Sequence, residues 1–302
     1  MRLSAGALTV LALLGTECGG TTGGHLIQVP FEAGGIARDT TSPFTFPTGQ
    51  QWSVTLTQAE VVLGPLYFNI AAPQPSVFRS GVVIMQVTSQ FVVDMLDPTL
   101  QPVAGGADGQ TGTAISVEIG FYTSVNGYND TIAPGAPLVA SGQQGTAFLA
   151  GTATATKSGV TVPFAGRVQI TSALVTALNP IDRLARAAGA DCDLTFTSSS
   201  GPLQLRVDPR HWFDQANFCN LVTPPPRPAA TDGGVADAAA VDATAADAVG
   251  ADGGSTGAPA AGEPCSPSPG TVYGWSDSNP FNSAVLGGMK GSVGVYSFSL
   301  GP

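Results

Sequence analysis

Apolar and polar residues alternate along most of this chain, the pattern of β-strands that bury one face. The clearest examples are WSVTL, which begins at Trp52, and ISVEIGFY, which begins at Ile115. Further strand candidates are 25–31, 61–70, 82–87 and 91–96. Turn residues separate these segments at short spacing, so the pattern predicts an all-β protein.

Two longer stretches read as hairpins. FLAGTATATKSGVTVPFAGRVQI is expected to turn at 157–159. Its return strand is expected to bury Val162, Phe164, Val168 and Ile170. LTFTSSSGPLQLRV repeats the plan around 200–202. The face that it is expected to bury carries Leu203, Leu205 and Val207.

The pattern indicates one short helix, NPIDRLARAAG, over 179–189. Asn179 can cap it, Pro180 suits its first position, and Gly189 can end it. Everything else favours an antiparallel β-sandwich.

A low-complexity segment, 223–268, interrupts the strand-like sequence. From Asp232 to Asp252 it has an aspartate every fifth residue among Ala, Gly and Val. A period of five spreads these aspartates around a helix, and it does not match a calcium-binding loop. The final stretch GSVGVYSFSL alternates again, and a lone strand is not stable. We therefore expect a single sandwich domain over 25–302, with 223–268 as a disordered Pro/Ala/Asp-rich insertion before the last strand.

The N-terminus has the pattern of an export signal. Arg2 precedes an apolar run over 5–14, which is too short to span a bilayer. We expect a signal peptide over 1–17, a lipid on Cys18 and a Gly/Thr tether over 18–24. Glu17 departs from the small residue that usually precedes a lipidated cysteine, so a soluble periplasmic protein remains the alternative. Either location places the protein in the cell envelope of a Gram-negative bacterium, in the periplasm or at the outer membrane.

The charge of the chain argues against one class of partner, and its cysteines indicate a disulfide. Charged residues make up 11% of the chain and the formal net charge is −10, which argues against nucleic acid. An exported chain forms disulfides, and we expect one between Cys219 and Cys265, which flank the low-complexity segment. The alternative is that these two and Cys192 are all buried thiols.

The segment RVDPRHWFD holds the densest group of chemically active side chains. A binding rim would use Arg210, His211, Trp212 and Asp214. The competing interpretation has Trp212 and Phe213 capping the core while Arg210 pairs with Asp214. The chain has two histidines, and His25 with His211 is a metal-site candidate that lacks a third ligand. No nucleophile-elbow, dinucleotide-binding or P-loop motif is present.

Four stretches, QWSVTLTQAEVVLGPLYF, GTATATKSGVTVPFAGRV, LQLRVDPRHWFD and GSVGVYSF, resemble those of uncharacterised secreted lipoproteins of myxobacteria and related Gram-negative bacteria. That resemblance implies an envelope β-sandwich without an established activity. More remotely, WSVTLTQAEVVLGPLYF followed by ISVEIGFY is similar to methanobactin-associated periplasmic copper-binding proteins. Their copper is held by histidines and an oxidised tryptophan, and neither His25 nor His211 lies in such a ligand motif.

We therefore expect a non-catalytic envelope lipoprotein with a binding or structural role and no cofactor. A periplasmic copper-binding protein is the alternative, and a hydrolase with its site on the loops is the third hypothesis.

Overall fold

A computed structural model of the chain describes residues 24–71, 82–121, 146–170, 186–222, 265–291 and 293–302. In these ranges the chain is all-β, as the alternation predicted, and its strands form one large sheet. The strands are β1 (Leu26–Gly35), β2 (Phe44–Pro47), β3 (Trp52–Asn69), β4 (Val83–Val87), β5 (Phe91–Asp94), β6 (Gln101–Gln110), β7 (Gly112–Phe121), β8 (Ala147–Ala155), β9 (Thr161–Val168), β10 (Arg186–Phe196), β11 (Leu203–Val207) and β12 (Tyr296–Leu300). Three short helices lie between β11 and β12: η2 (Arg210–Phe213), α3 (Cys219–Val222) and α4 (Pro280–Met289).

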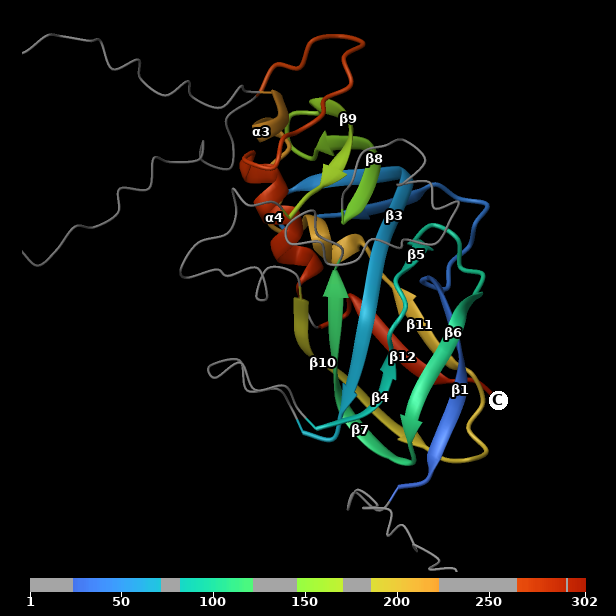
Figure 1. Cartoon of the computed structure of the whole chain (residues 1–302). Helices are drawn as coiled ribbons and strands as arrows, with labels where there is room; N and C mark the ends of the chain where they lie inside the picture. Colours follow the sequence, from blue (N-terminus) through green and yellow to red (C-terminus); the bar gives the residue numbers. More distant parts are fainter. Residues whose placement is uncertain (1–23, 72–81, 122–145, 171–185, 223–264, 292) are drawn as a thin grey trace, which may run out of the picture.

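The central strand is β3, which joins two segments that were expected to be separate strands. It pairs with β2, β5, β8, β4 and β7 along its 18 residues. The main path of the sheet runs β10-β7-β3-β4-β6-β1-β11-β12. Its two end strands also pack against each other, because β10 contacts β12. The sheet therefore wraps around one core (Figure 1).

Phe68 on β3 shows how this core is closed. Its ring lies 5.8 Å from the ring of Phe196 on β10 and 5.3 Å from that of Phe298 on β12, both edge-on. Edge-to-face contact is a favoured geometry for aromatic rings. The alternation that predicted these strands thus brings three distant segments into one aromatic contact.

The hairpin expected at 157–159 is confirmed, since β8 and β9 pair in register. All four side chains expected on its inner face are buried. The second expected hairpin is wrong: β10 pairs with β7, and β11 pairs with β1 and β12. Residues 197–202 therefore connect two separate parts of the sheet.

One pair departs from a purely antiparallel sandwich. β1 and β11 run parallel, with Phe31 opposite Leu203 and Gly35 opposite Val207. A parallel pair needs a long crossover, and the chain between these strands contains nine of the others. Apolar and polar residues alternate in the same way in parallel and antiparallel strands. The alternation could therefore not reveal that β1 and β11 run parallel.

The helix expected over 179–189 is not observed in its described part. Arg186–Phe196 forms β10, while 179–185 lies outside the described residues. Arg186 is opposite Gly120 on β7 and forms a 2.6 Å ion pair with Glu118. Pairing with the edge of β7 has prevailed over local helix propensity.

The longest helix in the described residues, α4, begins with the same Asn-Pro signal. Asn279 accepts a 2.8 Å hydrogen bond from the backbone N–H of Phe281, and Pro280 occupies the first turn. α4 then buries Phe281, Val285, Leu286 and Met289. Its buried face fixes the helix against η2, α3 and β9.

The last strand returns to the sheet, as its alternation predicted. β12 is antiparallel to β11, from Tyr296 opposite Val207 to Leu300 opposite Leu203. Cys219 and Cys265 form the expected disulfide, with their Cα atoms 5.3 Å apart. Residues 223–264 of the expected insertion lie outside the described residues, as do the expected signal peptide, Cys18 and all of the tether except Gly24. None of the helices in the described ranges has the length and apolar character needed to cross a membrane.

Candidate functional site

The stretch from Asp208 to Asp214 follows β11. It begins with an ion pair between Asp208 and Arg210. Asp208 is buried just after β11, and its carboxylate accepts hydrogen bonds from Arg210 Nε at 2.8 and 2.9 Å. Its Oδ1 also accepts the backbone N–H of Arg210 at 3.0 Å. These bonds raise the pKa of Arg210. The expected pair between Arg210 and Asp214 is therefore wrong, because a buried carboxylate two residues away is the nearer partner.

The aromatic residues of this stretch belong to the core. Trp212 and Phe213 are fully buried. Phe213 stacks on Phe218 at 5.9 Å, and both rings contact Phe164 on β9, at 6.1 and 5.1 Å. Trp212 is thus no part of an exposed binding rim, and the interpretation that it caps the core is correct. Its burial anchors η2 and fixes the neighbouring side chains.

His211 and Asp214 are the exposed pair of η2. His211 Nδ1 lies 3.0 Å from Asp214 Oδ2, and the two side chains are 50% and 45% exposed. Because a carboxylate only accepts, this contact places a proton on Nδ1 and orients the ring. Nε2 is left without a hydrogen-bond partner among the described residues. A Cβ atom on Gly294, whose φ is +76°, would lie 2.9 Å from Nε2, so glycine there leaves room for the ring.

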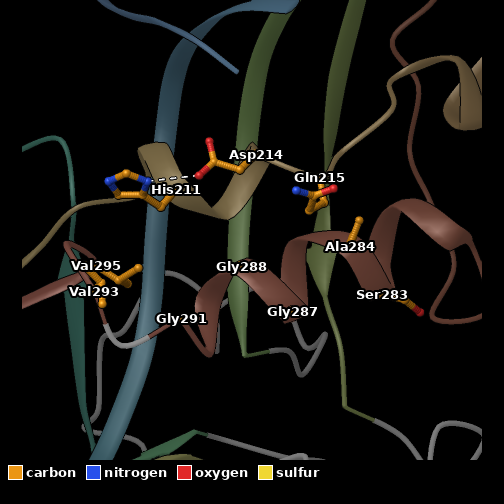
Figure 2. Close-up of a pocket in the computed structure, with 10 residues that line it drawn as sticks. All are labelled: His211, Asp214, Gln215, Ser283, Ala284, Gly287, Gly288, Gly291, Val293 and Val295. Carbon is orange, nitrogen blue, oxygen red and sulfur yellow. Dashed lines mark hydrogen bonds and ion pairs between the residues drawn. The ribbon is translucent and has the colours of Figure 1, made fainter. Parts of the chain in front are cut away.

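An open groove lies between η2 and α4, with a volume of about 560 Å³. Figure 2 shows His211 and Asp214 on one side and the glycines of α4 along the other. The lining residues are His211, Asp214, Gln215, Ser283, Ala284, Gly287, Gly288, Gly291, Val293 and Val295. Small side chains on α4 make this space, and two valines give it an apolar end.

Two neighbouring glycines of α4 have different roles. A Cβ on Gly288 would lie 2.5 Å from Trp212 Cα and 2.6 Å from its carbonyl oxygen, so glycine lets the helix touch η2. A Cβ on Gly287 would meet no atom within 4 Å, because this position faces the groove. Gly288 therefore supports the groove, and Gly287 leaves it open.

The two histidines of the metal hypothesis lie at opposite ends of the parallel β1–β11 pair. His25 precedes β1, whose far end at Gly35 is opposite Val207, four residues before His211. The ten residue-to-residue steps from His25 to Gly35 span about 33 Å of strand. His25 and His211 therefore cannot share one metal ion. No group of three or more metal-ligating side chains occurs in the described part of the chain.

In the residues that the structure describes, the side chains a hydrolase would need are only partly brought together in the groove. His211 held by Asp214 has the geometry of a general base. Figure 2, however, places Ser283 at the far end of the groove, with its hydroxyl directed away from His211. The hydrogen-bond partner of His211 in these ranges is Asp214, and no hydrogen bond joins it to a serine there.

Sequence reasoning selected His211 and Asp214 correctly as exposed polar residues of this stretch. It missed the α4 half of the groove. The Asn279-Pro280 start signal and the glycine pair at 287–288 were the available hints.

Fold and site together define an all-β protein with a solvent-open groove where two short helices meet at one end of the sheet. We compared the chain with protein-family models, with curated proteins and with solved structures, and no match was found. The resemblances to secreted lipoproteins and copper-binding proteins therefore stay predictions.

Proposed function

We propose that this protein is a non-catalytic binding protein of the cell envelope, held at a membrane by a lipid on Cys18, and that its ligand occupies the α4–η2 groove. The observation that carries the binding role is the groove itself, with His211 oriented by Asp214 at its side. A disulfide between Cys219 and Cys265 favours an oxidising compartment, as expected for an exported protein.

The groove favours a small organic ligand. Its volume of about 560 Å³ falls in the range of small-molecule sites. Its valines, alanine and glycines suit an apolar body, while His211, Asp214 and Gln215 offer hydrogen bonds. Asp214 and the formal net charge of −10 disfavour an anion. The ligand class is therefore a neutral or weakly cationic molecule with an apolar body and a hydrogen-bonding group.

A neutral fluorescent probe tests the groove. N-phenyl-1-naphthylamine has an aromatic body and one N–H, and its emission should rise when it binds. Gly287→Leu should abolish that rise, because the new side chain enters open space in the groove. Val272→Leu, an exposed position that does not line the groove, is the matched control. Equal emission from wild type and Gly287→Leu would rule the groove out.

Ligand binding should also raise the melting temperature. A molecule present at one hundred times its Kd stabilises the folded state by about 2.7 kcal/mol. A thermal-shift screen of neutral and weakly basic compounds would reveal such ligands as shifts of several degrees. The shifts should disappear in Gly287→Leu and decrease in His211→Ala.

The lipid anchor has a separate test. Cys18→Ser should move the protein from the membrane fraction to the soluble periplasmic fraction. Unchanged fractionation would mean that Cys18 carries no lipid, and it would leave the groove proposal intact.

Copper binding is retained as a second candidate because of one observation. Nδ1 of His211 is held by a carboxylate, the arrangement that orients metal-ligating histidines through their second nitrogen. Titration of the purified protein with Cu²⁺ should then show one site that His211→Ala removes and His25→Ala leaves unchanged. Identical titrations of all three proteins would end the copper hypothesis.

A further inference from the structure

Exposed large apolar side chains gather at one end of the sheet. Leu26, Ile70, Val82 and Ile115 are 90%, 43%, 49% and 46% exposed. In the described part of the chain two others are comparably exposed, Val272 and Val293, and they lie on segments outside this sheet. Figure 1 shows β1 beginning at the end of the sheet away from α3 and α4.

Strand register makes three of these residues direct neighbours. The backbone N–H of Ile70 donates a 3.0 Å hydrogen bond to the carbonyl oxygen of Val82. Asn69 is opposite Ser116, so the next step of this antiparallel pair places Ile70 beside Ile115. Backbone pairing thus places Val82, just before β4, and Ile70, just after β3, next to Ile115 on β7.

Leu26 lies on the same edge of the sheet. It is opposite Gln110 on β6, and the adjacent Gly109 is opposite Met85 on β4. Adjacent strands are about 4.8 Å apart, so β1 and β7 are about 19 Å apart across this edge. We call Leu26, Ile70, Val82 and Ile115 the apolar end.

The surroundings of the apolar end are mostly uncharged. Thr113 and Thr195 share a 2.9 Å hydrogen bond there, and Thr111 bonds to the backbone of His25. Asp193 on β10 is an exposed acidic residue beside this region, as is Asp108 on β6, which is opposite Gln28 on β1. Together with the net charge of −10, these two aspartates would repel an anionic lipid surface. Apolar contact with zwitterionic lipid is the interaction that this surface fits.

The position of Cys18 identifies the occupant. Leu26 is eight positions after it, and eight fully extended residues span about 28 Å at most. That reach exceeds the width of the apolar end. A lipid on Cys18 would therefore keep this end at a high effective concentration next to the bilayer.

We propose that the apolar end is a membrane-contacting surface, and that Leu26, Ile70, Val82 and Ile115 enter the headgroup region of a zwitterionic bilayer. This inference rests on the proposed lipid anchor at Cys18. It leaves the α4–η2 groove at the opposite end of the sheet open to the aqueous phase. A few apolar side chains bind lipid weakly, so the contact depends on the tether.

An environment-sensitive label on a tethered protein tests the contact. The chain from residue 18 onward carries Cys18→Ser and Cys192→Ser, with six histidines placed ahead of it. These histidines bind nickel-chelating lipid in phosphatidylcholine–phosphatidylethanolamine vesicles and replace the lipid anchor. A nitrobenzoxadiazole label is attached at Leu26→Cys or Ile115→Cys, and at Val272→Cys as the control. Leu26 is almost fully exposed, so its substitution does not affect folding.

Labels at 26 and 115 should increase in emission by about twofold or more on tethering, while the label at 272 should not change. Unchanged emission at both positions would overturn the proposal, and so would an equal increase at 272. An increase that follows protein concentration without vesicles would assign the apolar end to contact between copies of the chain, and would also overturn it. Because the histidine tag replaces the lipid, these outcomes are independent of whether Cys18 is acylated in the cell.

Discussion

The glycine pair of α4 provides a direct test of how the groove is built. Gly287 and Gly288 are neighbours on one helix, so replacing either with alanine changes helix propensity in the same direction. Alanine is favoured over glycine by up to about 1 kcal/mol within a helix. The two positions differ in the space around the added methyl group.

At Gly287 the methyl group meets nothing within 4 Å, so Gly287→Ala should stabilise the protein by up to about 1 kcal/mol. At Gly288 it would lie 2.5 Å from Trp212 Cα, which is backbone and cannot turn away. Overpacking of this kind costs about 1–3 kcal/mol. After the gain in propensity, Gly288→Ala should destabilise the protein by up to about 2 kcal/mol.

Urea denaturation followed by circular dichroism measures both free energies of unfolding. In thermal melts, each kcal/mol should appear as a shift of about 2–4 °C. The two variants should move in opposite directions from wild type. If both stabilise the protein, α4 does not pack on η2 through Gly288, and the groove described above is wrong.

Three further predictions concern the core and the disulfide. Replacing Cys219 and Cys265 with alanine opens a loop of 46 residues and should lower the free energy of unfolding by about 4 kcal/mol in urea denaturation; an unchanged midpoint would exclude the bond. The buried ring of Phe164 contacts at least four other phenylalanine or tryptophan rings. Phe164→Ala should therefore lower the free energy of unfolding by about 3–5 kcal/mol in the same assay. Burial raises the pKa of Tyr296, which donates a 2.8 Å hydrogen bond to the carbonyl oxygen of Met289. The unfolded phenol therefore ionises first, and stability present below about pH 10 is lost as the pH rises further. Tyr296→Phe should cost about 1 kcal/mol at pH 7 and lose less stability above pH 10; parallel pH profiles would contradict this.

Local patterns predicted the strands well because the side-chain period of a strand is a property of the strand itself. Every residue expected on the inner face of the β8–β9 hairpin is buried, and so are Leu203, Leu205 and Val207. Strand partners were harder to predict. The segment after Phe196 looked like a hairpin, but its strands pair with β7 and β1, which lie far away in the sequence.

The site was half predictable for a related reason. His211 and Asp214 were both candidates for a binding rim, but their pairing at the end of η2 was not expected. The partner of Arg210 was missed because it depends on the burial of Asp208 at the end of β11. The α4 side of the groove was missed because the Asn-Pro signal occurs twice, at 179–180 and 279–280, and local sequence does not rank the two.

Residue patterns alone show that this chain forms strands, where most of them lie, and that its last strand needs a partner. Apolar alternation and turn residues carry that information locally. The folded chain was needed to show that β1 and β11 run parallel, that Arg186 enters a strand, and that α4 meets η2 to form a groove. Those outcomes depend on which distant surfaces bury each other, and a one-dimensional pattern does not contain that choice.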